Sequence, residues 1–423
     1  PTLSDPLVQH YLENLCYRLS FAAQSDYQQL HIVLLPDYQI NAFAVAGGVI
    51  GINTGLLTYA ENEAELAAVL SHEIAHLDQH HYLRAQESQQ QDQWLYLGTL
   101  LASIVLAAHR TDNDAGLALG LSTQAAMIDK QLRYSRLQES EADHIGMQTL
   151  VSAGFNAQAM ADFFKKMDQQ ARIVGLMPEF LLTHPLTQDR IADSTLRAQQ
   201  LHTKGELNSL DYQLARTRLM AILYAKDHNQ QLQHYQQQLQ TNPQDEVSQL
   251  GIAFSLLNSE KYSDARLAIE KLRKQSPQRI DYIIAQADIE LADHQPAMAL
   301  TILEEALLIS PNNDTLRFYA ARAAMKNQQY TKATHWFNSL AYERPDDISV
   351  WQNLIECYQA QKDGLQLLRA RAEFAFLLGS YDKALADLEQ AKKLAVNNYP
   401  LLAKIKQRQL FIEQTKEVSK KIK

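Results

Sequence analysis

The stretch Ala68-Val-Leu-Ser-His-Glu-Ile-Ala-His-Leu-Asp78 decides how the rest of the chain is interpreted. It contains the pattern His-Glu-x-x-His. On a helix, His72 and His76 lie four residues apart on one face, close enough to bind one metal ion. Glu73 lies beside the first histidine, where its carboxylate could reach a water on that metal. The stretch therefore predicts a helix with two ligands and the general base of a zinc-dependent hydrolase.

A catalytic zinc site needs a third protein ligand, and the residues just after this helix do not supply one. The metzincin class requires a glycine at position 79 and a histidine at position 82, but this chain has Gln79 and Tyr82. His80 lies two helical turns from His72, roughly 12 Å along the axis, which is too far to share one ion. The third ligand must therefore come from a distant part of the chain.

The acidic stretch Glu139-Ser-Glu-Ala-Asp143 is the best source of that ligand. Glu139 and Asp143 lie four residues apart, so a helix would place both carboxylates on one face. Glu139 is then the predicted third ligand, and Asp143 would accept the outward N–H of a ligand histidine, most simply His72. Glu141 is the competing ligand, and a solvated acidic face is the alternative without metal.

A further histidine is found in the segment Thr183-His-Pro-Leu-Thr-Gln-Asp-Arg-Ile191. Pro185 disfavours a helical conformation of His184, so this residue is expected in an extended segment or loop. We expect His184 either to donate to the oxyanion that develops during hydrolysis or to bind zinc as a fourth ligand and keep the enzyme latent. Arg190 is the second candidate for the oxyanion donor, and a histidine without any metal role is the third interpretation of His184.

The residues before the metal-binding stretch predict a small sheet. Residues 5–22 have apolar positions at helical spacing, and residues 31–35 (His-Ile-Val-Leu-Leu) predict a buried strand. Residues 41–53 predict two strands around a turn at Gly47 and Gly48. This hairpin would either offer an edge for a substrate backbone by strand addition or serve as an ordinary structural hairpin.

Two apolar stretches follow the metal-binding helix, at residues 94–108 and 115–128. The first has 15 residues, short of the roughly 20 that span a bilayer, so a buried or interfacial helix is expected. Together they predict a helical hairpin, packed on the domain or mobile as a lid over the site. Helices are then predicted at 131–151 and 157–174.

From about residue 209 onward the pattern becomes continuously helical with a period of 34 residues. Prolines recur at that spacing, at Pro243, Pro277, Pro311 and Pro345. Alanines recur in step with them, at Ala265, Ala299 and Ala333. This is the signature of tetratricopeptide repeats, whose helix pairs must stack because one repeat cannot bury its apolar face alone. The 34-residue repeat loses its regular spacing near 362–380. A capping helix is predicted at 398–416.

Composition bounds the partners and the compartment. The chain has 423 residues, 46% hydrophobic and 21% charged, as expected for a globular protein of two or three domains. Proteins that bind nucleic acid usually carry an excess of positive charge, whereas this chain has a net charge of −9. No nucleic-acid partner is therefore expected. Cys16 and Cys357 form either two separate buried thiols, which we favour, or one long-range bridge. No signal peptide is visible at the first residues, as in a chain from which one has been removed.

The motifs taken together resemble the M48 family of gluzincin metallopeptidases. The resemblance rests on four segments, at 72–76, 139–143, 41–48 and 183–191. It implies an α+β fold, with a mainly helical gluzincin metallopeptidase domain and a small β-sheet over residues 1–205. An all-α tetratricopeptide superhelix would follow over residues 206–423.

The resemblance also implies a site and a cellular role. One Zn²⁺ per chain would be held by His72, His76 and Glu139, with Glu73 as the general base. The repeat tail resembles that of periplasmic family members, which implies quality control of outer-membrane β-barrel clients and maturation of the lipopolysaccharide-transport pore. The repeats would contact the barrel-assembly machinery, and peripheral membrane association is one further expectation. The alternative function is a scaffold or chaperone-like adaptor with a latent or residual metal site.

Overall fold

The computed structural model describes residues 5–27, 29–45, 47–79, 136–174, 178–201 and 204–421. These residues form two compact units, Pro1–Arg216 and Thr217–Lys423. We call them the N-terminal unit and the C-terminal unit. The predicted helical hairpin at 94–108 and 115–128, with its role as a lid, lies outside the described residues.

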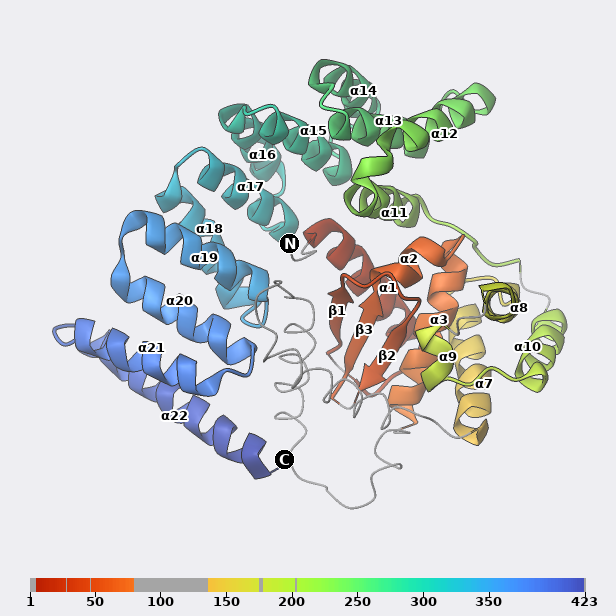
Figure 1. The fold of residues 1–423 in the computed structure, drawn as a ribbon, viewed down its shortest axis with the longest axis horizontal. Coiled ribbons are helices and arrows are strands. Elements are labelled where there is room, and N and C mark those ends of the chain that lie inside the picture. The colour runs from red at the N-terminus through yellow and green to blue at the C-terminus, as the bar shows by residue number, and fades with distance from the viewer. Residues whose placement is uncertain are drawn as a thin grey trace. The chain divides into compact units, whose positions relative to one another are not determined.

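A three-stranded sheet with the order β1-β3-β2 lies in the N-terminal unit (Figure 1). Strand β1 (His31–Leu35) pairs in parallel with β3 (Val49–Asn53), and β2 (Ala42–Val45) pairs with β3 in antiparallel. Gly47 and Gly48 have φ angles of 93° and 82°, which glycine adopts without steric strain, so the predicted hairpin is confirmed. The predicted strand at 31–35 is confirmed with the same bounds, but its predicted burial is wrong, because β1 lies at an edge of the described sheet and is mostly half-buried.

Helices pack against this sheet. The helices predicted at 5–22, 68–78 and 157–174 are confirmed, and so is the described part of the helix predicted at 131–151, which begins at Arg136. The short helices at 54–59 and 179–183 and the helix at 188–201 were not predicted. The structure has α1 (Pro6–Ala23), α2 (Thr54–Tyr59), α3 (Glu63–Asp78), α7 (Arg136–Ser152), α8 (Gln158–Val174), α9 (Glu179–Thr183) and α10 (Gln188–Leu201).

Helix α3 is the centre of the N-terminal unit and packs against α1, α7, α8 and β2. It begins after Asn62, whose side chain accepts a hydrogen bond from the backbone N–H of Glu65 at 3.0 Å. Every residue from Glu63 to Leu77 is buried, so the helix is covered on all of its faces. Because a buried polar group is costly without a partner, the polar residues of α3 must be satisfied inside the unit.

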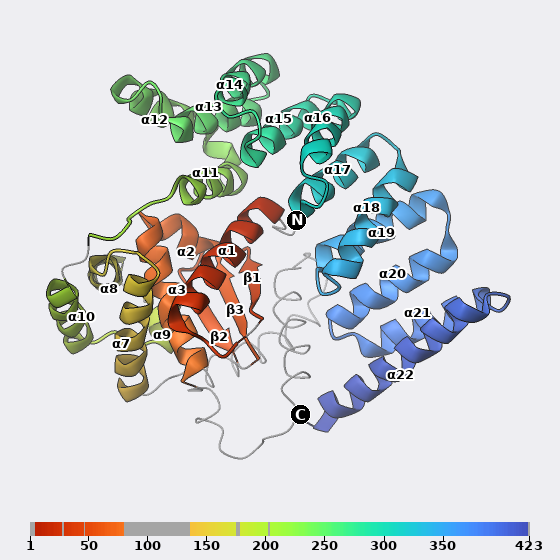
Figure 2. The same ribbon diagram turned by 180° about the vertical axis from the view of Figure 1, so that it is seen from behind.

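The C-terminal unit consists of helices that pack on their neighbours in chain order (Figure 2). Helix α11 (Leu210–Leu223) contains the boundary between the units, and a 3₁₀ turn, η1 (Ala225–Asp227), follows it. The remaining helices are α12 (His228–Thr241), α13 (Glu246–Asn258), α14 (Tyr262–Gln275), α15 (Ile280–Ala292), α16 (Pro296–Ile309), α17 (Asp314–Lys326), α18 (Tyr330–Glu343), α19 (Ile348–Gln361), α20 (Gly364–Leu377), α21 (Tyr381–Leu394) and α22 (Tyr399–Lys421).

The 34-residue period corresponds to helix pairs, as predicted. The four prolines lie in the turns between one pair and the next. Ala265, Ala299 and Ala333 are fully buried at equivalent positions in the first turns of α14, α16 and α18. A small residue there lets neighbouring helices approach closely, which explains the period. Among the described helices, none combines the length and the apolarity that a bilayer crossing requires.

Candidate metal centre

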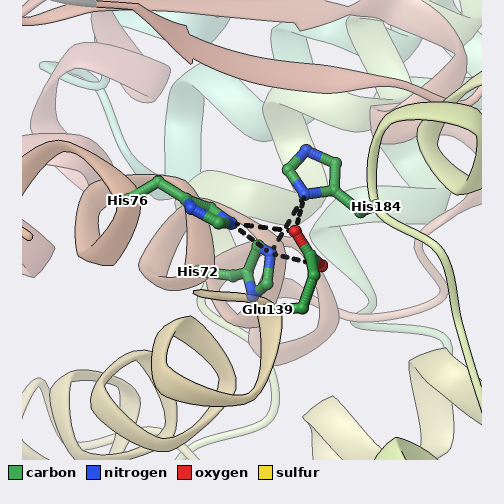
Figure 3. Close-up of side chains that lie close together, drawn as sticks. All are labelled: His72, His76, Glu139 and His184. Atoms are coloured by element: carbon green, nitrogen blue, oxygen red, sulfur yellow. Dashed lines mark hydrogen bonds and ion pairs between the residues drawn. The ribbon is translucent and has the colours of Figure 1, made fainter. Parts of the chain in front are cut away.

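Three segments far apart in the sequence bring their side chains together in the N-terminal unit (Figure 3). Helix α3 supplies His72 and His76, α7 supplies Glu139, and His184 comes directly after α9. All four side chains are about 1% exposed. One potential ligand atom from each lies within 4.8 Å of the others. The predicted candidates therefore converge on one point.

The distances between these atoms define a compact group. The Nε2 atoms of His72 and His76 lie 3.0 Å apart. Glu139 places Oε1 at 3.4 Å from His76 Nε2 and Oε2 at 3.6 Å from His72 Nε2. His184 Nδ1 lies 3.3 Å from His72 Nε2 and 3.0 Å from Glu139 Oε1. The four side chains thus form a closed group of three imidazoles and one carboxylate.

This donor set fits a zinc ion. Ligand atoms at 2.0–2.1 Å from zinc in a tetrahedron lie roughly 3.3–3.4 Å from one another. The observed separations of 3.0–3.6 Å scatter around that value. Burial lowers the pKa of His76, which keeps its imidazole neutral and its lone pair available to a metal.

A close approach of two helices sets this geometry. A Cβ atom on Gly146 of α7 would lie 3.0 Å from both the Cα and the backbone nitrogen of His72. Any larger residue would push α7 away from α3 and separate Glu139 from the histidines. Gly146 was not predicted as a site residue; the available signal was a glycine about one turn after Asp143 within a helical pattern.

Asp143 and Arg190 lie behind the cluster. Asp143 Oδ1 lies 3.0 Å from His72 Nδ1, the contact that the sequence predicted. The guanidinium of Arg190 donates to both oxygens of Asp143, at 2.7 and 2.8 Å, and its Nη1 lies 2.6 Å from Glu139 Oε2. Nη1 also donates to the carbonyl oxygen of Pro185 at 2.9 Å. Arg190 therefore joins the two acidic residues of α7 to the segment that carries His184.

Glu73 lies next to the cluster and is fully buried. Its Oε1 is 3.4 Å from Nε2 of His184, so His184 is placed between Glu73 and the other donors. Burial raises the pKa of Glu73, which favours the protonated form of its carboxyl group. Glu141, the competing ligand, is half-buried on α7 and does not belong to the cluster.

The backbone and a neighbouring ring fix the position of His184. Its φ and ψ of −119° and 80° lie outside the helical region, as expected before proline, and its N–H donates to the carbonyl of Phe180 at 2.8 Å. The rings of Phe180 and His184 stack with centroids 4.6 Å apart and planes 25° apart. Phe180 was not predicted, and nothing in the sequence distinguishes it from an ordinary core aromatic.

The chain is similar to known proteins over most of its length. A profile described as "Peptidase family M48" matches residues 6–198, and a tetratricopeptide repeat profile matches residues 290–356. The beta-barrel assembly-enhancing proteases of Yersinia pestis and Escherichia coli (strain K12) are 34% and 33% identical, over 92% of this chain and 80% of theirs. The mitochondrial metalloendopeptidase OMA1 of Saccharomyces cerevisiae is 29% identical over 43% of this chain and 51% of its own.

Proposed function

The chain belongs to peptidase family M48, and on this premise we propose that it is a zinc-dependent endopeptidase for the assembly and quality control of outer-membrane β-barrel proteins. The observation that carries the proposal is the buried group of His72, His76, Glu139 and His184 beside Glu73. The similarity to proteases named for β-barrel assembly extends over 92% of the chain, so it includes the repeats as well as the peptidase domain.

We assign the zinc ligands to His72, His76 and Glu139. A zinc ion held there would polarise the scissile carbonyl and lower the pKa of an attacking water to about 7. Glu73 accepts the proton of that water on its carboxylate and later transfers it to the leaving amine. Its burial supports this role, because the raised pKa favours a proton that stays on the carboxyl group between the two transfers.

Arg190 suits a positioning role better than the predicted oxyanion role. Its guanidinium contacts Asp143, Glu139 and the carbonyl of Pro185 rather than an open position of the site. We therefore infer that Arg190 orients Glu139 directly and His72 through Asp143.

The position of His184 supports the proposal that it binds zinc as a fourth ligand and keeps the enzyme inactive. Its Nδ1 occupies a fourth donor position in the group, which is the place that a reacting water needs. Removal of this side chain in His184→Ala opens that position, so hydrolysis of casein should increase several-fold. The absorption spectrum of the Co²⁺-substituted protein should change as well, because one nitrogen ligand is lost.

The matched control is His144→Ala, which removes an exposed histidine of α7 and should change neither measurement. Lower hydrolysis by His184→Ala with an unchanged Co²⁺ spectrum would indicate the oxyanion role instead. If both measurements stayed at the wild-type level, His184 would have no metal or catalytic role.

The edge of the sheet beside the site supports a peptide substrate. Strand β2 is an edge strand of the described sheet and packs against α3, which carries Glu73. A substrate backbone could pair with this edge by strand addition, the mode in which main-chain hydrogen bonds give affinity without sequence preference. The hairpin would then combine its structural role with substrate binding.

The repeats suit a protein partner, for which we propose the barrel-assembly machinery and its clients in the periplasm. Tetratricopeptide repeats present extended binding surfaces, and the relatives are bacterial proteins of barrel assembly. Peripheral membrane association, maturation of the lipopolysaccharide-transport pore and a functional boundary at 205/206 stay predictions.

The decisive experiment compares the wild type with Glu73→Gln on an outer-membrane barrel protein stalled in assembly, with the zinc content of each protein measured. The wild type should degrade this client, and Glu73→Gln should lose about 10²–10⁴-fold in rate at equal zinc content. Glu141→Gln is the matched control, since it makes the same change on α7 outside the cluster.

A second candidate function is a repeat scaffold with a latent metal site, and the closed group of four donors favours it. This function would be indicated if neither the wild type nor Glu73→Gln degraded the client while both bound zinc and the client. Activity of His184→Ala in the same assay would then separate a latent protease from a residual metal site.

A further inference from the structure

A cavity of about 100 Å³ lies in the C-terminal unit among α18, α19, α20, α21 and α22. These are the blue helices of Figure 1. Trp351, Leu388 and Ile405 contribute apolar surface to its walls. Arg369, Lys404 and Arg408 contribute three cations. An apolar wall with cations beside it suits a ligand that is itself apolar at one end and anionic at the other.

The cations of this cavity exceed the acidic groups that could neutralise them. Arg408 pairs with Glu373, with Nη2 and Oε2 2.6 Å apart. Arg369 is half-buried and donates to the neutral amide oxygen of Gln366 at 2.7 Å. In the part of the chain that the structure describes, no carboxylate lies within ion-pair distance of Arg369 or Lys404. The cavity thus has a local excess of positive charge in a chain with a net charge of −9.

The size of the cavity limits what can enter it. Typical small-molecule sites have about 300–1,000 Å³, so this cavity holds about one side chain and its neighbouring polar group. A polypeptide that ran through the cavity would need room for backbone on both sides, whereas a chain end needs room on one side only. A terminal carboxylate also matches the guanidinium fork of Arg369, which binds carboxylates by two parallel hydrogen bonds.

We propose that this cavity binds the free C-terminal carboxylate of a polypeptide, with the last, apolar side chain against Trp351 and Ile405. The proposal rests on the proposed function in one respect, that the ligand is a client polypeptide. The repeat unit would then recognise an exposed chain end, and the peptidase unit would act on the same client.

The test uses the full-length protein with Glu73→Gln, so that the probe is not cleaved. The probe is a fluorescein-labelled ten-residue peptide of glycine and serine that ends in phenylalanine, with either a free or an amidated C-terminus. Fluorescence anisotropy should show at least tenfold weaker binding of the amidated peptide, because amidation removes the charge that Arg369 and Lys404 bind.

Matched double variants locate the effect. Arg369→Met with Lys404→Met removes two cations from the cavity, so it should weaken binding of the free peptide at least tenfold and abolish the difference between the two peptides. Arg322→Met with Lys406→Met removes two exposed cations of α17 and α22 that do not line the cavity, and it should retain both affinities.

Two results would overturn the proposal. One is equal affinity of the wild-type cavity for the free and the amidated peptide. The other is an equal loss of binding in the two double variants, which would indicate general electrostatic attraction. Hydrolysis of casein is measured separately with Glu73 intact, where the control double variant Arg322→Met with Lys406→Met should retain the wild-type rate. A lack of hydrolysis in all of these proteins would count against the peptidase function and not against the cavity.

Discussion

The two units of this chain bury polar groups in different ways. The N-terminal unit concentrates most of its buried ionisable side chains around one point, between α3, α7 and the segment after α9. The C-terminal unit buries mainly alanine and aliphatic side chains at repeating positions, and its ion pairs, such as Arg317 with Glu343, are distributed among separate repeats.

Because of this difference, the two units should respond differently to a single substitution. A concentrated group of buried charges is stable only while each member retains its partners, so one substitution should affect the whole group. Repeats have stability that is approximately a sum of neighbour contacts, so one substitution should have a modest effect. The following changes test this contrast, beginning with the largest expected effect.

Arg190→Met should destabilise the N-terminal unit by about 3–5 kcal/mol, because it leaves Glu139 and Asp143 buried without their cation. Hydrogen–deuterium exchange followed by mass spectrometry should show faster exchange in peptides from α3, α7 and α10, with unchanged exchange in α13–α22. Arg197→Met removes an arginine of the same helix whose side chain is 39% exposed. Its partners, Asp193 at 3.7 Å and His144, lie outside the cluster, so this change should have little effect. Similar exchange in both variants would contradict the concentrated arrangement.

Asp143→Asn should lower zinc affinity by about 10–100-fold, or roughly 1.4–2.7 kcal/mol, because the charge that orients His72 is lost. Competition with a chromogenic chelator measures this affinity. Asp193→Asn changes an exposed carboxylate in the same way and serves as the control. If zinc affinity were the same in all three proteins, Asp143 would have no role in holding the metal ligand.

Ile284→Val should have the smallest effect. Ile284 of α15 is fully buried, and the loss of one methyl group from such a site costs about 0.5–1.5 kcal/mol. Urea unfolding followed by circular dichroism measures this change. Ile309→Val makes the same change at a residue that is 64% exposed and should stay within about 0.5 kcal/mol of the wild type. A loss as large as that expected for Arg190→Met would show that the repeats are as sensitive as the metal centre.

The helices and their types could largely be predicted from the sequence, because they depend on local periodicity. The 34-residue period correctly predicted the helix pairs of the C-terminal unit. The glycine pair correctly predicted the hairpin of β2 and β3. The burial of β1 was predicted wrongly, because an apolar run does not reveal whether a strand lies at the centre or at the edge of a sheet.

The sequence by itself determined which residues could form a metal centre. It also determined two spacings on helices, from His72 to His76 and from Glu139 to Asp143. These spacings follow from helix geometry alone. Only the tertiary structure decided that α7 approaches α3 closely at Gly146, that His184 completes the group, and that Arg190 contacts acidic residues. The physical reason is that such contacts depend on packing between segments distant in the sequence, about which local patterns carry no distance information.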